Sequence, residues 1–152
     1  MSVLDAGKVA KMAQQYEAKL VNEYLISKYP NDLQWRRVRV GPVPTKEDAR
    51  YYGVMLRWAD AIVKHGNVML IIEAKVKADL GAMSQIEEYI KLFGQTPEFS
   101  EYWDLQRKGV LLTGFDDLMI KQSCAERGID YVVYKPMWIN EYLNKLQRVG
   151  QQ

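Results

Sequence analysis

The order of apolar and polar positions along the 152 residues predicts helices and strands that alternate along the chain. In the first helix, apolar side chains recur every three or four residues, which is the spacing of one face of an amphipathic helix. Shorter runs rich in branched and aromatic residues predict strands. The expected helices are 3–28, 80–93, 96–106, 116–128 and 136–149, and the expected strands are 33–40, 54–63, 68–76, 108–114 and 129–135. This order implies an α/β fold in which helices cover the faces of a mixed β-sheet.

The second and third strands flank a segment with turn chemistry, Lys64-His65-Gly66-Asn67, and are expected to form a β-hairpin. Pairing the two ends of that segment places Asp60 opposite Ile71. Because side chains alternate between the faces of a strand, Glu73 and Lys75 then lie on the face of Asp60 and Ile71. Asp60 and Glu73 become diagonal neighbours, about 7 to 8 Å apart at the backbone. A register displaced by one residue would put the two carboxylates on opposite faces.

Three ionisable groups on one face of an apolar hairpin indicate that these charged side chains have a function. Burying unpaired charge is costly, and a divalent cation would offset that cost. The carboxylates of Asp60 and Glu73, the carbonyl oxygen of Ala74 and water molecules form a hard oxygen site suited to Mg²⁺ or Mn²⁺. The alternative is a partly exposed strand end at which Glu73 and Lys75 form a solvated pair.

The order and spacing of these residues resemble the PD-(D/E)xK nuclease superfamily, which has the restriction-endonuclease-like fold. The matching residues are Asp60, the triplet Glu73-Ala74-Lys75, and Gln85-Ile86-Glu87-Glu88-Tyr89, which is similar to the extra motif of the RecB-like branch. The resemblance covers about residues 9 to 135 and departs from the family's pattern at Ala59, which replaces a proline. It implies a metal-dependent nuclease that hydrolyses phosphodiester bonds in DNA.

The resemblance also implies roles for single residues. Asp60 and Glu73 would hold one or two Mg²⁺ ions, and Lys75 would hold or activate the attacking water and stabilise the charge that develops on the phosphate. Gln85 would orient Lys75 or a phosphate, and Tyr89 would support it.

A glutamate of the first helix is a further candidate in this resemblance. Glu17 lies about as far before the first strand as the helix glutamate that contacts the metal in similar nucleases, and Glu23 is the second candidate. The alternative for both is an exposed helix glutamate.

Basic side chains ahead of the acidic strand are candidate DNA contacts, because guanidinium groups bind phosphate oxygens in pairs. Alternation along the first strand puts Trp35, Arg37 and Arg39 on one face. Arg36 points to the other face. The following loop, 41–53, with at most one helical turn, adds basic and aromatic residues that can follow a nucleic-acid backbone and stack on bases. The alternatives are an edge strand whose charge prevents aggregation and an ordinary polar loop. The candidate DNA-binding residues are Arg36, Arg37, Arg39, Lys46, Arg50 and Tyr51.

Composition narrows the class of protein. The chain is 48% hydrophobic and 26% charged, as in ordinary globular domains, and we expect a single domain over 1–152 with a helical insertion at about 96–107. The net charge of +2 supplies no global basic field, so a nucleic-acid surface must be local. The single cysteine, Cys124, is expected in the core, and His65 in the hairpin turn. We expect a cytoplasmic protein with no membrane contact, since no apolar run approaches the length of a membrane span.

Two other functions stay open. The first is a noncatalytic nucleic-acid or protein-binding module on the same fold, which the near-neutral charge favours. The second is a homodimeric Holliday-junction resolvase that recognises the shape of branched DNA. With no separate recognition domain in the sequence, either the choice of DNA is loose or a protein partner supplies it.

Overall fold

The computed structural model describes residues 3–52 and 56–151; within them, the side chains of residues 3–5, 49, 51, 52 and 149–151 are not described. The helices are α1 (Val3–Lys28), α2 (Lys46–Tyr52), α3 (Leu80–Phe93), α4 (Leu118–Glu126) and α5 (Ile139–Gln151), and η1 (Pro97–Tyr102) is a short 3-10 helix. The strands are β1 (Leu33–Val40), β2 (Arg57–His65), β3 (Val68–Lys75), β4 (Gln106–Thr113) and β5 (Asp130–Val133). The predicted order of helices and strands is confirmed, and the first residues of the second predicted strand, 54 and 55, lie outside the described residues.

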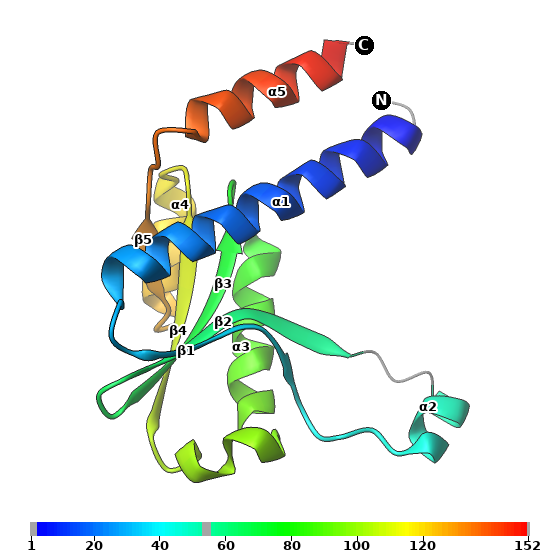
Figure 1. Cartoon of the computed structure of the whole chain (residues 1–152), viewed down its shortest axis with the longest axis vertical. Helices are drawn as coiled ribbons and strands as arrows, with labels where there is room; N and C mark the ends of the chain where they lie inside the picture. Colours follow the sequence, from blue (N-terminus) through cyan, green and yellow to red (C-terminus); the bar gives the residue numbers. More distant parts are fainter. Residues whose placement is uncertain (1–2, 53–55, 152) are drawn as a thin grey trace.

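Within the described chain, five strands form one mixed sheet in the order β1-β2-β3-β4-β5. β1, β2 and β3 are antiparallel, whereas β4 is parallel to β3 and β5 is parallel to β4. The parallel pairs follow from the crossover helices α3 and α4. Each helix returns the chain to the end of the sheet at which the preceding strand began. α1 lies on one face of the sheet with α5 packed beside it, and α3 and α4 lie on the other face (Figure 1). The expected mixed sheet flanked by helices is confirmed.

Buried apolar side chains hold the helices on both faces of the sheet. On one face, Leu20 and Leu25 of α1 pack against Ile72 of β3 and other sheet residues. On the other face, α3 approaches β4 so closely that a Cβ on Gly109 would lie 2.4 Å from the side chain of Ile86. These contacts fix both helices relative to the strands between them.

The loop predicted at 41–53 contains a longer helix than expected. The Thr45 hydroxyl accepts a hydrogen bond from the Asp48 amide at 3.0 Å, and the Asp48 carboxylate accepts one from the Thr45 amide at 3.2 Å. This reciprocal cap satisfies free amide groups at the start of α2. The predicted insertion helix is instead the short helix η1, and its Phe99 packs in the core against Trp35.

The β-hairpin is confirmed, but its register is displaced by two residues. The strands pair from His65 with Val68 outward, so the turn consists of Gly66 and Asn67 alone. Gly66 adopts a φ of +59°. The predicted pairing of Lys64 with Asn67 would have required His65 at the first turn position, where tight hairpin turns favour glycine.

A displacement of two residues keeps each side chain on its face, because the alternation has a period of two. Continuing the observed register by one pair sets Asp60 directly across from Glu73, and the predicted diagonal relation is wrong. Ile71 packs under α3 with Tyr89 and Phe93, whereas Asp60, Glu73 and Lys75 line the pocket beside α1, so the predicted shared face is wrong for Ile71.

Two further observations concern the predicted class of protein. Cys124 is fully buried, as expected for a core residue. No helix in the described part of the chain is long and apolar enough to cross a membrane.

Candidate active site

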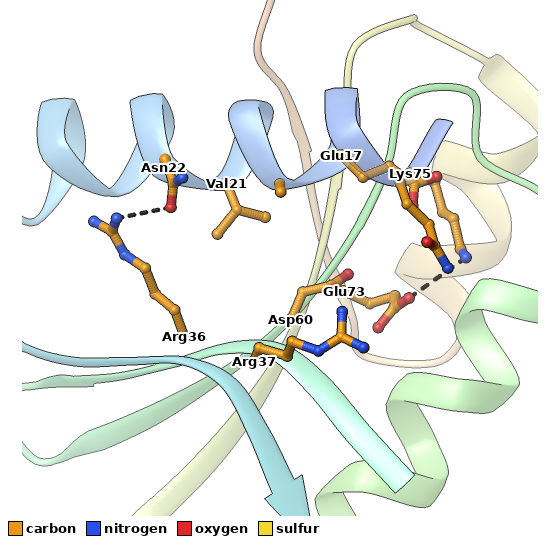
Figure 2. A pocket seen from close by; sticks show the side chains of 10 residues that line it. Glu17, Val21, Asn22, Arg36, Arg37, Asp60, Glu73 and Lys75 are labelled. Carbon is orange, nitrogen blue, oxygen red and sulfur yellow. Dashed lines mark hydrogen bonds and ion pairs between the residues drawn. The ribbon is translucent and has the colours of Figure 1, made fainter. Parts of the chain in front are cut away.

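A pocket of about 240 Å³ lies between α1 and the sheet (Figure 2). Four elements contribute to it. The lining residues are Gln14, Glu17, Ala18, Val21 and Asn22 from α1, Arg36 and Arg37 from β1, Asp60 from β2, and Glu73 and Lys75 from β3. The pocket therefore brings together three carboxylates and three cationic side chains.

The alternation predicted for β1 is interrupted at Arg37. Its φ of +50° is left-handed, which no other non-glycine residue in the described ranges shows. Trp35 and Val38 pack against the same cluster under α3 although they are three positions apart, an odd spacing that alternation would put on opposite faces, so the strand turns over between them. Arg37 faces the pocket on the α1 side. The predicted shared face of Trp35, Arg37 and Arg39 is therefore wrong, because alternation requires an extended backbone.

β2 turns over at the same level of the sheet. Ala59 is buried in the cluster under α3, whereas Ala61 is buried in the cluster under α1. Regular alternation would put both on one face. Asp60 lies between these two alanines, where β2 reverses its faces. It is across from Arg37 in the register of β1 and β2, and both side chains point into the pocket.

The Asp60 carboxylate is fixed by the neighbouring strand. The amide of Ala74 donates a hydrogen bond of 2.8 Å to Asp60 Oδ2. Burial raises the pKa of Asp60, while the hydrogen bond from Ala74 and the charge of Lys75 oppose this shift.

Glu73 is a carboxylate with an unsatisfied oxygen. It is 5% exposed, and its Oε2 is buried without a hydrogen-bond partner among the described residues. Lys75 Nζ lies 3.6 Å from Oε1. Burial, and then the charge of Asp60, raise the pKa of Glu73 to about 8, and Lys75 opposes the shift. Once Glu73 loses its proton, its oxygens can only accept hydrogen bonds, so a bound cation is a fitting partner for Oε2.

Glu17 reaches the same pocket from α1. Burial raises the pKa of its carboxyl to about 7, and the positive charge of Lys75 opposes the shift. The second helix candidate, Glu23, does not line the pocket. Its Oε2 accepts a hydrogen bond of 2.7 Å from Trp138 Nε1, which ties α1 to the segment before α5. Six residues correspond to about one and two-thirds turns of a helix, so Glu17 and Glu23 point in different directions.

Lys75 is a cation in this pocket. Burial alone would lower its pKa, but the negative charges of Glu17, Glu73 and Asp60 together raise it. Its side chain keeps 27% of its surface exposed, so a ligand in the pocket can reach it.

The carboxylates of the pocket can be compared with the ligands that a divalent metal ion requires. Within residues 3–52 and 56–151, no group of three or more Asp, Glu, His or Cys side chains is close enough to hold a metal ion. The structure brings together a pair, Asp60 and Glu73, one of which has a buried unpaired oxygen. Mg²⁺ usually keeps several waters and takes only one or two protein carboxylates, so this pair fits it.

The two candidates on α3 lie outside the pocket lining. Tyr89 is 6% exposed and packs under the sheet. Burial, and then the charges of Glu73 and Asp60, raise its pKa to about 12. Gln85 is half-buried and makes no hydrogen bond to Lys75 in the described structure.

The candidate DNA contacts of β1 have different surroundings. Arg36 lines the pocket and donates a hydrogen bond of 2.7 Å to Asn22 Oδ1. Arg39 lies outside the pocket and forms an ion pair of 3.0 Å with Glu98. Arg37 lines the pocket beside Asp60. The structure thus brings two of these three arginines into the pocket lining, and Arg37 is the one beside Asp60.

The other candidate DNA contacts lie on α2, which projects away from the sheet (Figure 1). Lys46 and Arg50 are exposed there. Tyr51 belongs to this helix, and its side chain lies outside the described residues. The structure does not bring α2 into the pocket lining.

The pocket also contains residues of α1 that sequence reasoning missed. Gln14, Ala18, Val21 and Asn22 line it beside Glu17. They lie three, one, four and five positions from Glu17, so the helical period around this glutamate could have identified most of this face.

The sequence matches no protein-family model and no curated protein. The fold is similar to two solved structures, a repair endonuclease from Pyrococcus abyssi (TM-score 0.50) and EndoMS in complex with double-stranded DNA (TM-score 0.52), each 16% identical in sequence. The similarity covers 78% and 82% of this chain but only 46% and 45% of the other chains. The chain thus spans a little under half the length of these two neighbours, with which it shares a mixed sheet flanked by helices.

Proposed function

We propose that the protein is a divalent-metal-dependent nuclease that hydrolyses phosphodiester bonds in DNA. The carrying observation is Glu73, a buried carboxylate with an unpaired oxygen, beside Asp60 and Lys75 in one pocket. The fold similarity to a repair endonuclease and to a structure with bound double-stranded DNA supports the class of substrate.

Asp60 and Glu73 are the residues that would hold Mg²⁺ or Mn²⁺, with the carbonyl of Ala74 as a further oxygen. Glu17 would add negative charge from α1. When bound, the ion would supply Lewis-acid chemistry and positive charge beside the phosphate. Asp60 is suited to its part because the Ala74 amide already fixes its orientation at 2.8 Å.

Lys75 would stabilise the negative charge that develops on the phosphate during hydrolysis. The carboxylates around it raise its pKa, so it stays protonated at neutral pH and is poorly suited to remove a proton from water. A fixed cation next to developing negative charge lowers the barrier by electrostatic stabilisation.

The test is incubation of the protein with circular plasmid, linear duplex, single-stranded and four-way-junction DNA in Mg²⁺, Mn²⁺ or EDTA. Lys75→Ala should reduce cleavage by about 10²-fold or more, and Lys75→Arg, which keeps the charge, by less. Lys121→Ala removes the same charge from the exposed surface of α4, on the other face of the sheet, and should leave cleavage unchanged.

The preferred DNA separates the subclasses. Preference for the four-way junction would support a homodimeric resolvase, and degradation of linear ends would support an exonuclease similar to RecB. If no DNA is cut with either metal, and calorimetric titration detects no Mn²⁺ binding, the nuclease proposal is wrong.

The second candidate is a noncatalytic DNA-binding module. Two observations favour it: the net charge is only +2, and in the described part of the chain no three metal-binding side chains lie close enough together to hold one ion. Such a module would bind DNA without cutting it, and Glu73→Gln would not change its affinity for DNA or Mn²⁺.

A further inference from the structure

Among the arginines of β1, Arg37 has the greatest freedom to bind a ligand. Its side chain extends along the sheet side of the pocket toward Asp60 and Glu73 (Figure 2). It makes no hydrogen bond or ion pair with any residue that the structure describes. Its neighbours differ, since Arg36 bonds to Asn22 and Arg39 to Glu98. A guanidinium group has five N–H donors, and those of Arg37 are available.

The backbone at Arg37 is held in an unfavourable conformation. A left-handed φ costs free energy at any residue with a Cβ, and glycine adopts it without that cost. A glycine here would turn β1 over equally well, so the backbone gives no reason for an arginine. Unfavourable conformations of this kind persist at sites where the side chain is needed.

The ligand of Arg37 must be an anion. When all three carboxyls of the pocket are ionised, the three cations Arg36, Arg37 and Lys75 balance them, and a divalent ion held by Asp60 and Glu73 would then leave the pocket positive. The charge of Arg37 already acts on Asp60, where it lowers the carboxyl pKa against the effect of burial. A group that the Arg37 guanidinium binds in this pocket would therefore be negatively charged, with two oxygens for the paired donors, as in a phosphate.

We infer that Arg37 binds the scissile phosphate of the DNA strand and stabilises its charge during hydrolysis. This inference rests on the proposed nuclease function and assigns Arg37, next to Asp60, to the reacting phosphate. Arg36, which bonds to Asn22 farther along the pocket, would bind the phosphates that flank the scissile one.

Steady-state cleavage of the DNA that the wild type cuts best tests the inference through kcat and KM separately. A contact that strengthens in the transition state changes kcat, whereas a flanking contact changes KM alone. Arg37→Ala and Arg37→Gly should lower kcat by about 10²-fold, with KM changed by less than about threefold. Arg37→Lys should recover only part of the loss, because an ammonium group cannot bind two oxygens in parallel. Lys121→Ala is the charge control and should match the wild type.

Two measurements separate binding of phosphate from a structural role. Arg37→Gly should melt at the same temperature as the wild type or higher, because glycine relieves the left-handed φ. Mn²⁺ affinity of Arg37→Ala, from calorimetric titration, should equal or exceed that of the wild type, because a nearby positive charge is removed. A role limited to holding Asp60 in place would instead weaken Mn²⁺ binding.

Several outcomes would overturn the inference. If Arg37→Ala keeps kcat within about threefold, or changes KM alone, Arg37 does not act on the scissile phosphate. If Arg36→Ala lowers kcat as much as Arg37→Ala does, the distinction between the two arginines is wrong. A wild type that cleaves no DNA refutes the proposed function itself, whereas an active wild type with an active Arg37→Ala refutes only the role of Arg37.

Discussion

At the scale of single residues, the pocket combines groups whose charges are unfavourable without a ligand. Asp60 and Glu73 repel each other when both are ionised, and burial deprives both of water. Lys75 offsets part of that cost from 3.6 Å. The unpaired oxygen of Glu73 shows that the compensation is incomplete within the described structure. Residues of this kind are retained for function more readily than for stability.

We predict that metal-free protein loses stability as the pH rises from about 5 to about 8. The folded-state pKa of Glu73 is about 8, against a usual value of 4.5. The folded protein therefore binds this proton more tightly than the unfolded chain does, and its contribution to stability is lost as the pH rises through the folded value. Asp60, Lys75 and Glu17 are the charged groups that face Glu73.

Glu73→Gln should flatten this dependence. At pH 8 in EDTA it should raise the free energy of unfolding by about 1 to 3 kcal/mol, because it removes a buried charge beside Asp60. Denaturant unfolding between pH 5 and 8.5 measures both effects. The control is Glu126→Gln, on an exposed glutamate of α4. Equal pH dependence in the wild type and Glu73→Gln would contradict the argument.

The two glutamates of α1 are also distinguishable. Glu17→Gln should weaken Mn²⁺ binding several-fold, because it removes one of the carboxylates that line the pocket. Glu23→Gln should bind Mn²⁺ as the wild type does, since a glutamine oxygen can still accept the hydrogen bond from Trp138. Calorimetric titration measures both variants, and a larger loss in Glu23→Gln would reverse the assignment.

At the scale of elements, the sequence predicts the helices and strands better than their details. The hairpin, the motif helix 80–93 and the first helix follow from apolar spacing and are confirmed. The predicted register of the β2–β3 hairpin differs from the observed one by two residues, because pairing depends on which residue occupies the first turn position. The turn-over at Arg37 has no local signal, since arginine is ordinarily extended in a strand.

The turn that sets the hairpin register gives a prediction of its own. Gly66→Ala should destabilise the protein by about 1 kcal/mol, because alanine resists the φ of +59°. Nothing lies within 4 Å of the added Cβ, so the cost is conformational. Gly7→Ala is the matched control: it lies within α1, also has open space around its Cβ, and should stabilise the protein by up to about 1 kcal/mol. Denaturant unfolding would contradict this prediction if both variants shifted stability in the same direction.

At the scale of the whole molecule, the candidate site depends on contacts between segments far apart in the sequence. The carboxylate pair was predictable because one hairpin carries both residues. The remainder of the pocket wall comes from α1, which lies over the sheet because Leu20 and Leu25 are buried there and because Trp138 bonds to Glu23 across 115 positions. Sequence periodicity identifies the buried face of α1 but not the strand residues that this helix will face.

Binding of a divalent ion should stabilise the entire fold. A ligand at 100 times its dissociation constant adds about 2.7 kcal/mol to the free energy of unfolding if it binds only the folded state. For a chain of this length that is a rise in Tm of about 5 to 10 °C. Mn²⁺ should therefore raise Tm, EDTA should reverse the rise, and the effect should be larger at pH 8.5 than at pH 6, because the protons on Glu17 and Glu73 compete with the ion at low pH. The variant with both Asp60→Asn and Glu73→Gln should show no rise at either pH. A rise of equal size in that variant would place the bound ion elsewhere on the protein.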